Sequence, residues 1–150
     1  MSLVKRLREW VALVNATFTT TSTGATTVGA LNFSVVSGEV WTVECRLTAQ
    51  CSNTGGIAYA ISAPSGSTIE GWVQSSTSAI TTLSYQRLTA INTLTSTALH
   101  TVATTPAPDL IWFVIVAGAT GTVALQAASK TSGQTTTVFV NSSMVAQRAA

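Results

Sequence analysis

The chain has 150 residues, of which 8% are charged, and its formal net charge is +2. The length fits one domain, and the charged fraction is far below the roughly 25% usual in soluble domains. So small and scattered a charge does not indicate a nucleic-acid partner, and no apolar run approaches the roughly 18 residues of a membrane-spanning helix. Thr and Ser together number 44, so hydroxyl groups rather than charges keep the surface wet. This composition is typical of extracellular adhesins and virion surface proteins.

The first segment, residues 1–16, has the spacing of an amphipathic helix. Leu3, Leu7, Trp10 and Val14 recur at intervals of four, three and four residues, which lines one face of a helix. A helix this short is marginal in water and needs a partner. Packing on its own β-domain and docking on sister subunits or another protein are both open, with disorder as a third possibility. In the docking interpretation the four apolar residues form the interface.

A Thr/Ser-rich tract over residues 17–27 has little to bury except Phe18 and predicts a linker or an irregular edge strand. The β-domain is expected over residues 28–148. Its clearest strand runs from Trp41 to Cys51, where apolar residues alternate strictly with polar ones. Cys45 and Cys51 share the buried parity of that strand. They lie six positions apart, about 20 Å in an extended chain, whereas a disulfide needs less than about 7 Å, so both are expected to be reduced core residues.

The remaining strands are expected at short intervals along the chain with turn residues between them. The expected ranges are 28–36, 57–61, 68–74, 80–91, 98–103, 110–117, 121–128, 135–140 and 143–147. Turns are expected at 37–38, 53–56, 64–66 and 131–134, which are rich in Gly, Asn, Pro and Ser. Eight to ten antiparallel strands without an intervening helix predict an all-β, jelly-roll-type β-sandwich.

The centre of this domain is expected to be a β-hairpin. Residues 110–117 are apolar on both parities, as in a strand covered on both faces, so Trp112 is predicted to be buried. A sugar-stacking platform of Trp41, Trp72 and Trp112 is the alternative, but core packing is the favoured role because Trp41 and Trp112 are both predicted to be buried. Gly118 and Gly121 then supply the positive φ angles of a tight turn. Residues 121–128 alternate, as a strand with one wet face does.

Catalytic and metal-binding patterns are missing from the sequence. His100 is the single histidine, and a metal site needs several ligands. A carboxylate pair of Glu70 and Asp109 is left open by the sequence, although dispersed acids usually only aid solubility. We therefore expect no enzyme, no cofactor and no metal site.

Four features in chain order resemble the small jelly-roll domains, of C1q/TNF-like type, in virion proteins of tailed bacteriophages. They are Ser37-Gly-Glu-Val-Trp-Thr-Val43, Gly56-Ile-Ala-Tyr-Ala-Ile-Ser-Ala-Pro64, the stretch Trp112–Leu125, and Thr136-Thr-Val-Phe-Val-Asn-Ser-Ser-Met-Val-Ala146. The resemblance covers roughly residues 28–148 and implies a homotrimer. It carries no catalytic motif.

The function expected on these grounds is that of a non-enzymatic virion structural protein of a tailed bacteriophage. It would decorate the capsid or form a short head or tail appendage, with itself and a major capsid or tail protein as partners. The alternative is a tail-tip adhesin that recognises a host-surface glycan or protein. Exposed aromatic residues at loop tips would favour the adhesin, and an exposed N-terminal helix inserted into a neighbouring subunit would favour the structural role.

Overall fold

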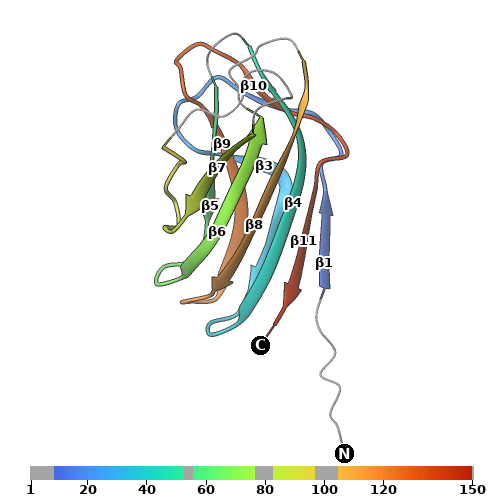
Figure 1. Cartoon of the computed structure of the whole chain (residues 1–150). Helices are drawn as coiled ribbons and strands as arrows, with labels where there is room; N and C mark the ends of the chain where they lie inside the picture. Colours follow the sequence, from blue (N-terminus) through green and yellow to red (C-terminus); the bar gives the residue numbers. More distant parts are fainter. Residues whose placement is uncertain (1–8, 53–55, 77–82, 97–104, 150) are drawn as a thin grey trace, which may run out of the picture.

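The computed structural model describes residues 9–52, 56–76, 83–96 and 105–149, which form an antiparallel β-sandwich (Figure 1). One sheet has eight strands and the other has three. The strands of the large sheet are β1 (Glu9–Leu13), β2 (Phe18–Thr20), β4 (Val40–Cys51), β6 (Thr68–Ser76), β7 (Leu83–Leu88), β8 (Ala107–Val116), β10 (Thr136–Val138) and β11 (Ser143–Arg148). Those of the small sheet are β3 (Thr26–Val35), β5 (Ile57–Ser62) and β9 (Gly121–Ser129).

The order of the strands is that of a jelly roll. β1 pairs with β11, β3 with β9 and β4 with β8, so the pairs are nested along the chain. A fourth pair completes the series, because residues 92–95 run antiparallel to β5: Asn92 N–H donates to the Ile61 carbonyl (2.8 Å) and Thr95 N–H to the Tyr59 carbonyl (2.9 Å). Nested antiparallel pairs divided between two sheets define this winding. The expected all-β jelly-roll sandwich is therefore confirmed.

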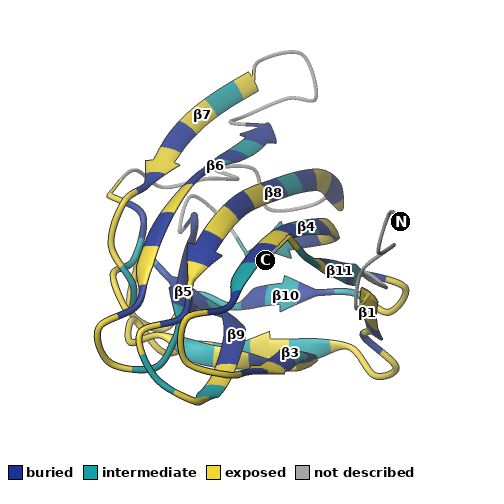
Figure 2. Ribbon diagram, turned by 90° about the horizontal axis from the view of Figure 1, so that it is seen from below, coloured by how far each residue is buried: buried dark blue, intermediate teal, exposed yellow. Residues whose placement is uncertain are grey.

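The β6–β7 hairpin lies outside this nested series. β6 pairs with β8 on one side and with β7 on the other, so the hairpin extends the large sheet past β8. The path through that sheet is β1-β11-β4-β8-β6-β7. The N-terminal strand and the added hairpin therefore occupy opposite edges of one sheet (Figures 1 and 2).

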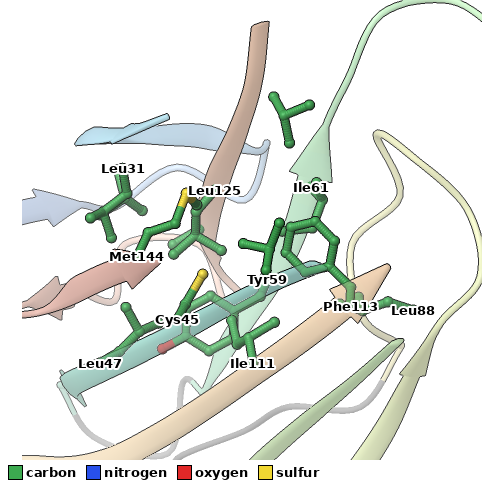
Figure 3. Close-up of a cluster of buried hydrophobic side chains, with 14 of the residues drawn as sticks. Leu31, Cys45, Leu47, Tyr59, Ile61, Leu88, Ile111, Phe113, Leu125 and Met144 are labelled. Carbon is green, nitrogen blue, oxygen red and sulfur yellow. The ribbon is translucent and has the colours of Figure 1, made fainter. Parts of the chain in front are cut away.

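The core lies between the two sheets (Figure 3). β4 contributes every second residue to it, including Cys45 and Leu47, as the alternation predicts. Tyr59 and Phe113 are among its largest fully buried side chains and come from opposite sheets. Burial of such side chains is worth about 1.5–3 kcal/mol each, which makes this interlayer the main source of stability.

The helix expected within residues 1–16 is wrong where the structure describes it. Residues 9–13 are the edge strand β1, in register with β11 from Glu9↔Gln147 to Leu13↔Ser143. The helical spacing is overridden because pairing with β11 satisfies the backbone groups of this segment. The expected linker also contains β2, which pairs with β10, and the start of β3. Residues 1–8 lie outside the described ranges, as does the whole of the strand expected at 98–103.

The central hairpin is also a wrong prediction. β8 and β9 are consecutive, yet β8 belongs to the large sheet and β9 to the small one. Their turn therefore crosses the sandwich. Gly118 does not supply a positive φ; instead, a Cβ built there would lie 2.1 Å from the carbonyl carbon of Gly66. The glycine is required because two turns touch backbone to backbone.

The burial of these two strands is the reverse of the prediction: β8 has one buried face, and β9 is buried on both. β8 alternates: Phe113 is 1% exposed, whereas Trp112 is 47% exposed. β9 is central in its sheet, and Val123, Ala124 and Leu125 are all buried. The predicted burial of Trp112 is therefore wrong. Within the described ranges there is no α-helix, and so none long and apolar enough to cross a membrane.

Candidate functional site

The solvent-facing side of the large sheet, called here the outer face, carries most of the large exposed hydrophobic residues. Successive residues of a strand point to opposite faces, and the register aligns them in rows across the sheet. One row runs Val11, Val145, Glu44, Trp112, Trp72 and Arg87 across six strands. The exposed large hydrophobic residues of the face are Val11, Leu13, Leu83, Tyr85, Trp112, Val114 and Val116. Apolar patches on this scale mark interaction surfaces in soluble proteins.

Polar side chains of β4 divide the outer face into two apolar regions. Thr42, Glu44 and Arg46 form the floor of a trough of about 470 Å³, with Val145 and Trp112 among the other residues that line it. Glu44 and Arg46 form an ion pair with each other, as their outward parity predicts. The division leaves one apolar region on β1 and the other on β6, β7 and β8.

The first region is the N-terminal edge patch, defined here as Trp10, Val11 and Leu13; Val11 and Leu13 lie on the outer face, and Trp10 projects from the opposite side of the same strand. These side chains are 51%, 58% and 57% exposed. In the described residues β1 has a strand partner on one side only, namely β11. An edge strand with large apolar side chains is a ready surface for another chain.

The structure places two of the four predicted interface residues, and their exposure differs. Trp10 is exposed, but Val14 is 3% exposed and belongs to the core. Its N–H donates to the Ser142 carbonyl at 2.8 Å, which holds the segment on the last strand. Leu3 and Leu7 lie outside the described residues. Because Trp10 is exposed and Val14 is buried, the four residues do not form one exposed stripe.

The second region is the aromatic hollow, lined by Trp72, Gln74, Tyr85 and Trp112, with a volume of about 270 Å³. Trp72 and Trp112 are directly opposite each other on paired strands. Tyr85 lies one row away, opposite Gln74. Residues opposite or diagonal on paired strands have Cβ atoms about 5–8 Å apart, within reach of aromatic rings.

A salt bridge fixes one side of the aromatic hollow. Arg87 Nη2 lies 2.6 Å from Glu70 Oε1, and its Nε lies 3.0 Å from the same oxygen. The guanidinium carbon of Arg87 is also 5.7 Å from the centroid of the Trp72 ring. This cation–π contact holds the indole in place from the β7 side.

The carboxylate pair left open by the sequence is not formed. Glu70 is exposed on the outer face, whereas Asp109 is 2% exposed and points into the core. The Tyr59 hydroxyl donates to Asp109 Oδ2 at 2.5 Å. Burial, followed by the charge of Asp109, raises the pKa of Tyr59 well above its usual value. The pair ties the two sheets together and is closed to substrate.

Other candidates for chemistry fall in the core or outside the described residues. Cys45 and Cys51 are buried and free of any disulfide, as predicted. Burial is the main cause that raises the pKa of each thiol. His100 lies outside the described ranges. Within those ranges no three His, Cys, Asp or Glu residues gather to hold a metal ion.

No protein-family model and no curated protein matches the chain. Among solved structures, the chain has a low similarity to the structure of infectious bursal disease virus Gt strain. The identity is 11% and the TM-score 0.25, and the match covers 96% of this chain and 38% of the other. The VP2 subviral particle of the same virus gives 9% identity and a TM-score of 0.24 over 96% and 38%. The chain thus spans less than two fifths of these proteins, and TM-scores this low carry no argument about its function.

The sequence favoured core packing of Trp112 over a stacking platform, because the residues around Trp112 have the composition of a core strand; Trp41 is buried as predicted, but Trp112 is not. Its neighbours Leu110, Val114 and Val116 are as apolar as those of the inner parity. The usable signal was Trp72, which stands on the opposite parity to Ile69 and Val73. Only the pairing of β6 with β8 shows that the two indoles share a face.

Proposed function

We propose that this chain is a non-enzymatic structural protein of a virus particle. In this proposal it forms a homotrimer that decorates the capsid, or a short head or tail appendage, of a tailed bacteriophage. The major capsid or tail protein is its second partner. The observation that carries the proposal is the N-terminal edge patch on β1.

The edge patch favours assembly because it is costly to leave in water. Trp10, Val11 and Leu13 are each more than half exposed on a strand whose far edge lacks a strand partner in the described residues. Full burial of one such side chain is worth about 1.5–3 kcal/mol. Contact with a sister subunit recovers that energy and covers the strand edge.

The composition and the buried network support a structural role. The core holds Asp109 in a hydrogen bond with Tyr59, and Glu44 and Glu70 are paired with arginines, so these carboxylates serve stability. The Thr- and Ser-rich, charge-poor surface and the resemblance to phage virion domains supply the virion part of the proposal. The trimeric state rests on that resemblance.

The assembly is tested by native mass spectrometry and sedimentation of three proteins. The wild-type chain should be a trimer. The double variant Val11→Lys/Leu13→Lys places two charges on the edge patch and should be monomeric. The control Val36→Lys changes a residue of similar exposure (51%) in the turn between β3 and β4, and it should remain trimeric.

Virion attachment is tested with the same proteins and with phage particles that lack this chain. Wild type and the Val36→Lys control should co-sediment with the particles. A wild-type chain that is monomeric, or an edge variant that assembles and attaches like wild type, would contradict the proposal.

A further inference from the structure

We propose that the aromatic hollow binds an uncharged glycan, with the rings of Trp72, Tyr85 and Trp112 against the apolar face of a pyranose. The hollow is built by β6, β7 and β8, at the opposite edge of the large sheet from the N-terminal edge patch. The inference therefore does not rest on the trimer or on the virion role.

The β6–β7 hairpin gives the first reason. It is not needed to complete the nested pairs of the jelly roll, although its inner side adds Ile69, Val73 and Leu88 to the core. Yet it supplies Trp72, Gln74 and Tyr85, three of the four residues that line the hollow. Tyr85 is 59% exposed. Without these residues Trp112 would stand alone on the outer face.

The shape and chemistry of the hollow match a sugar. Ligand sites are concave and mainly apolar, with a few polar groups that fix orientation. Here aromatic rings supply flat apolar surface. The Gln74 amide both donates and accepts hydrogen bonds, the Tyr85 hydroxyl does the same, and the indole N–H groups donate. Among the described residues none hydrogen-bonds to these side-chain groups. Sugar hydroxyls, which also donate and accept, complement such a set.

Charge decides between ligand classes. The arginines beside the hollow are committed: Arg87 is paired with Glu70 and Arg46 with Glu44. A nucleic acid or phosphorylated ligand requires cations that are available to its phosphates. A neutral ligand requires no free cation, and the two ion pairs beside the hollow leave its net charge close to zero. The hollow therefore favours an uncharged glycan over a nucleotide, a phospholipid headgroup or an acidic sugar.

A second copy of this chain is the competing occupant, because Trp, Tyr and Arg are also enriched at protein interfaces. A second copy would have to cover much more of the outer face to bury the roughly 1,200–2,000 Å² of a stable interface, whereas the concave hollow has a volume of about 270 Å³. The hollow is thus sized for a small ligand. A glycan-binding outer face would also give the expected adhesin alternative a specific site.

The test uses a printed array of neutral glycans and of sialylated and uronic-acid-containing glycans, followed by titration of the strongest neutral binder with tryptophan fluorescence. Wild-type chain should bind at least one neutral glycan. Trp112→Ala and Tyr85→Ala should each weaken that binding by roughly two- to tenfold, since each removes one stacking ring. Gln74→Ala should weaken it with no change in the aromatic surface.

The matched control is Trp10→Ala, which removes an indole of similar exposure from the other edge of the sheet (51%, against 47% for Trp112). It should bind the glycan as wild type does. Circular dichroism and a thermal melt verify that each variant is folded, and Tyr85→Ala on the edge strand β7 keeps the test valid if Trp112→Ala unfolds.

Three outcomes would overturn the inference. One is the absence of neutral-glycan binding by the wild-type chain. Another is an equal loss in Trp10→Ala and Trp112→Ala. The third is dissociation of the oligomer by Tyr85→Ala, which would show that a second copy covers the hollow. The edge variants that test assembly leave all four lining residues intact, so failure of one proposal is distinguishable from failure of the other.

Discussion

Two single alanine variants at consecutive residues of β8 test which side of this strand faces the core. Phe113 is fully buried between the sheets, whereas its neighbour Trp112 is half exposed on the outer face. Phe113→Ala leaves a cavity that the surrounding strands cannot fill, at a cost of about 3–5 kcal/mol. Trp112→Ala removes a ring that gains only about half of its burial energy, roughly 1 kcal/mol.

The assay is equilibrium unfolding in urea, followed by far-ultraviolet circular dichroism. With a urea dependence of about 2 kcal/mol per molar, the midpoint should fall by roughly 2 M for Phe113→Ala and by roughly 0.5 M for Trp112→Ala. Several protein concentrations are needed, because the stability of an oligomer depends on concentration. A loss for Trp112→Ala equal to or greater than that for Phe113→Ala would refute the assigned facing of β8.

Three further predictions concern the turns and the buried polar groups. Gly118→Ala should cost at least about 1–3 kcal/mol in thermal or urea unfolding, since its Cβ would overlap the facing turn backbone; a neutral effect would contradict the close contact. Cys45 and Cys51 should resist a thiol reagent in the native protein and both react after denaturation without reductant; fewer than two reactive thiols would contradict the free state. The free energy of unfolding should fall as the pH rises above about 10, the ordinary pKa of tyrosine. Burial and Asp109 hold the pKa of Tyr59 higher in the folded state, so the unfolded chain loses that proton first. Tyr59→Phe should be less stable at neutral pH and show a flatter alkaline decline; an unchanged slope in urea midpoints between pH 8 and 11 would contradict this linkage.

Much of the fold was predictable because β4 follows the period of two without exception. Each residue from Trp41 to Cys51 faces the side that its polarity indicates. The turns at Gly38, Gly66 and Gly133 were predictable too, since all three adopt positive φ angles that favour glycine. These features are local and need no knowledge of the other sheet.

The pairing of consecutive strands was not predictable from the same signals. A short glycine turn between two apolar strands fits a hairpin, but it also fits a crossing between two layers. The decision between them depends on Gly118 packing against Gly66, which lies far away in sequence. The apolar outer parity of β8 misled in the same way, because an exposed interaction surface has the composition of a core.

The N-terminal segment shows the same limit at an edge. A helical period fits Leu3, Leu7, Trp10 and Val14, yet residues 9–13 form a strand that pairs with the edge of β11. Local periodicity holds no information about a distant strand whose edge can pair with the segment in the fold. The expectation that this segment carries an attachment surface stays a prediction, now restricted in the described part to Trp10, Val11 and Leu13.

An image of labelled particles tests the proposed virion role most directly. Phage particles assembled with this chain, labelled through an antibody raised against it and viewed by electron microscopy, should show label at fixed and repeated positions on the head or tail. Particles assembled with the Val11→Lys/Leu13→Lys variant should show none. Label that is absent from wild-type particles, or scattered at random over them, would contradict a structural role in the virion.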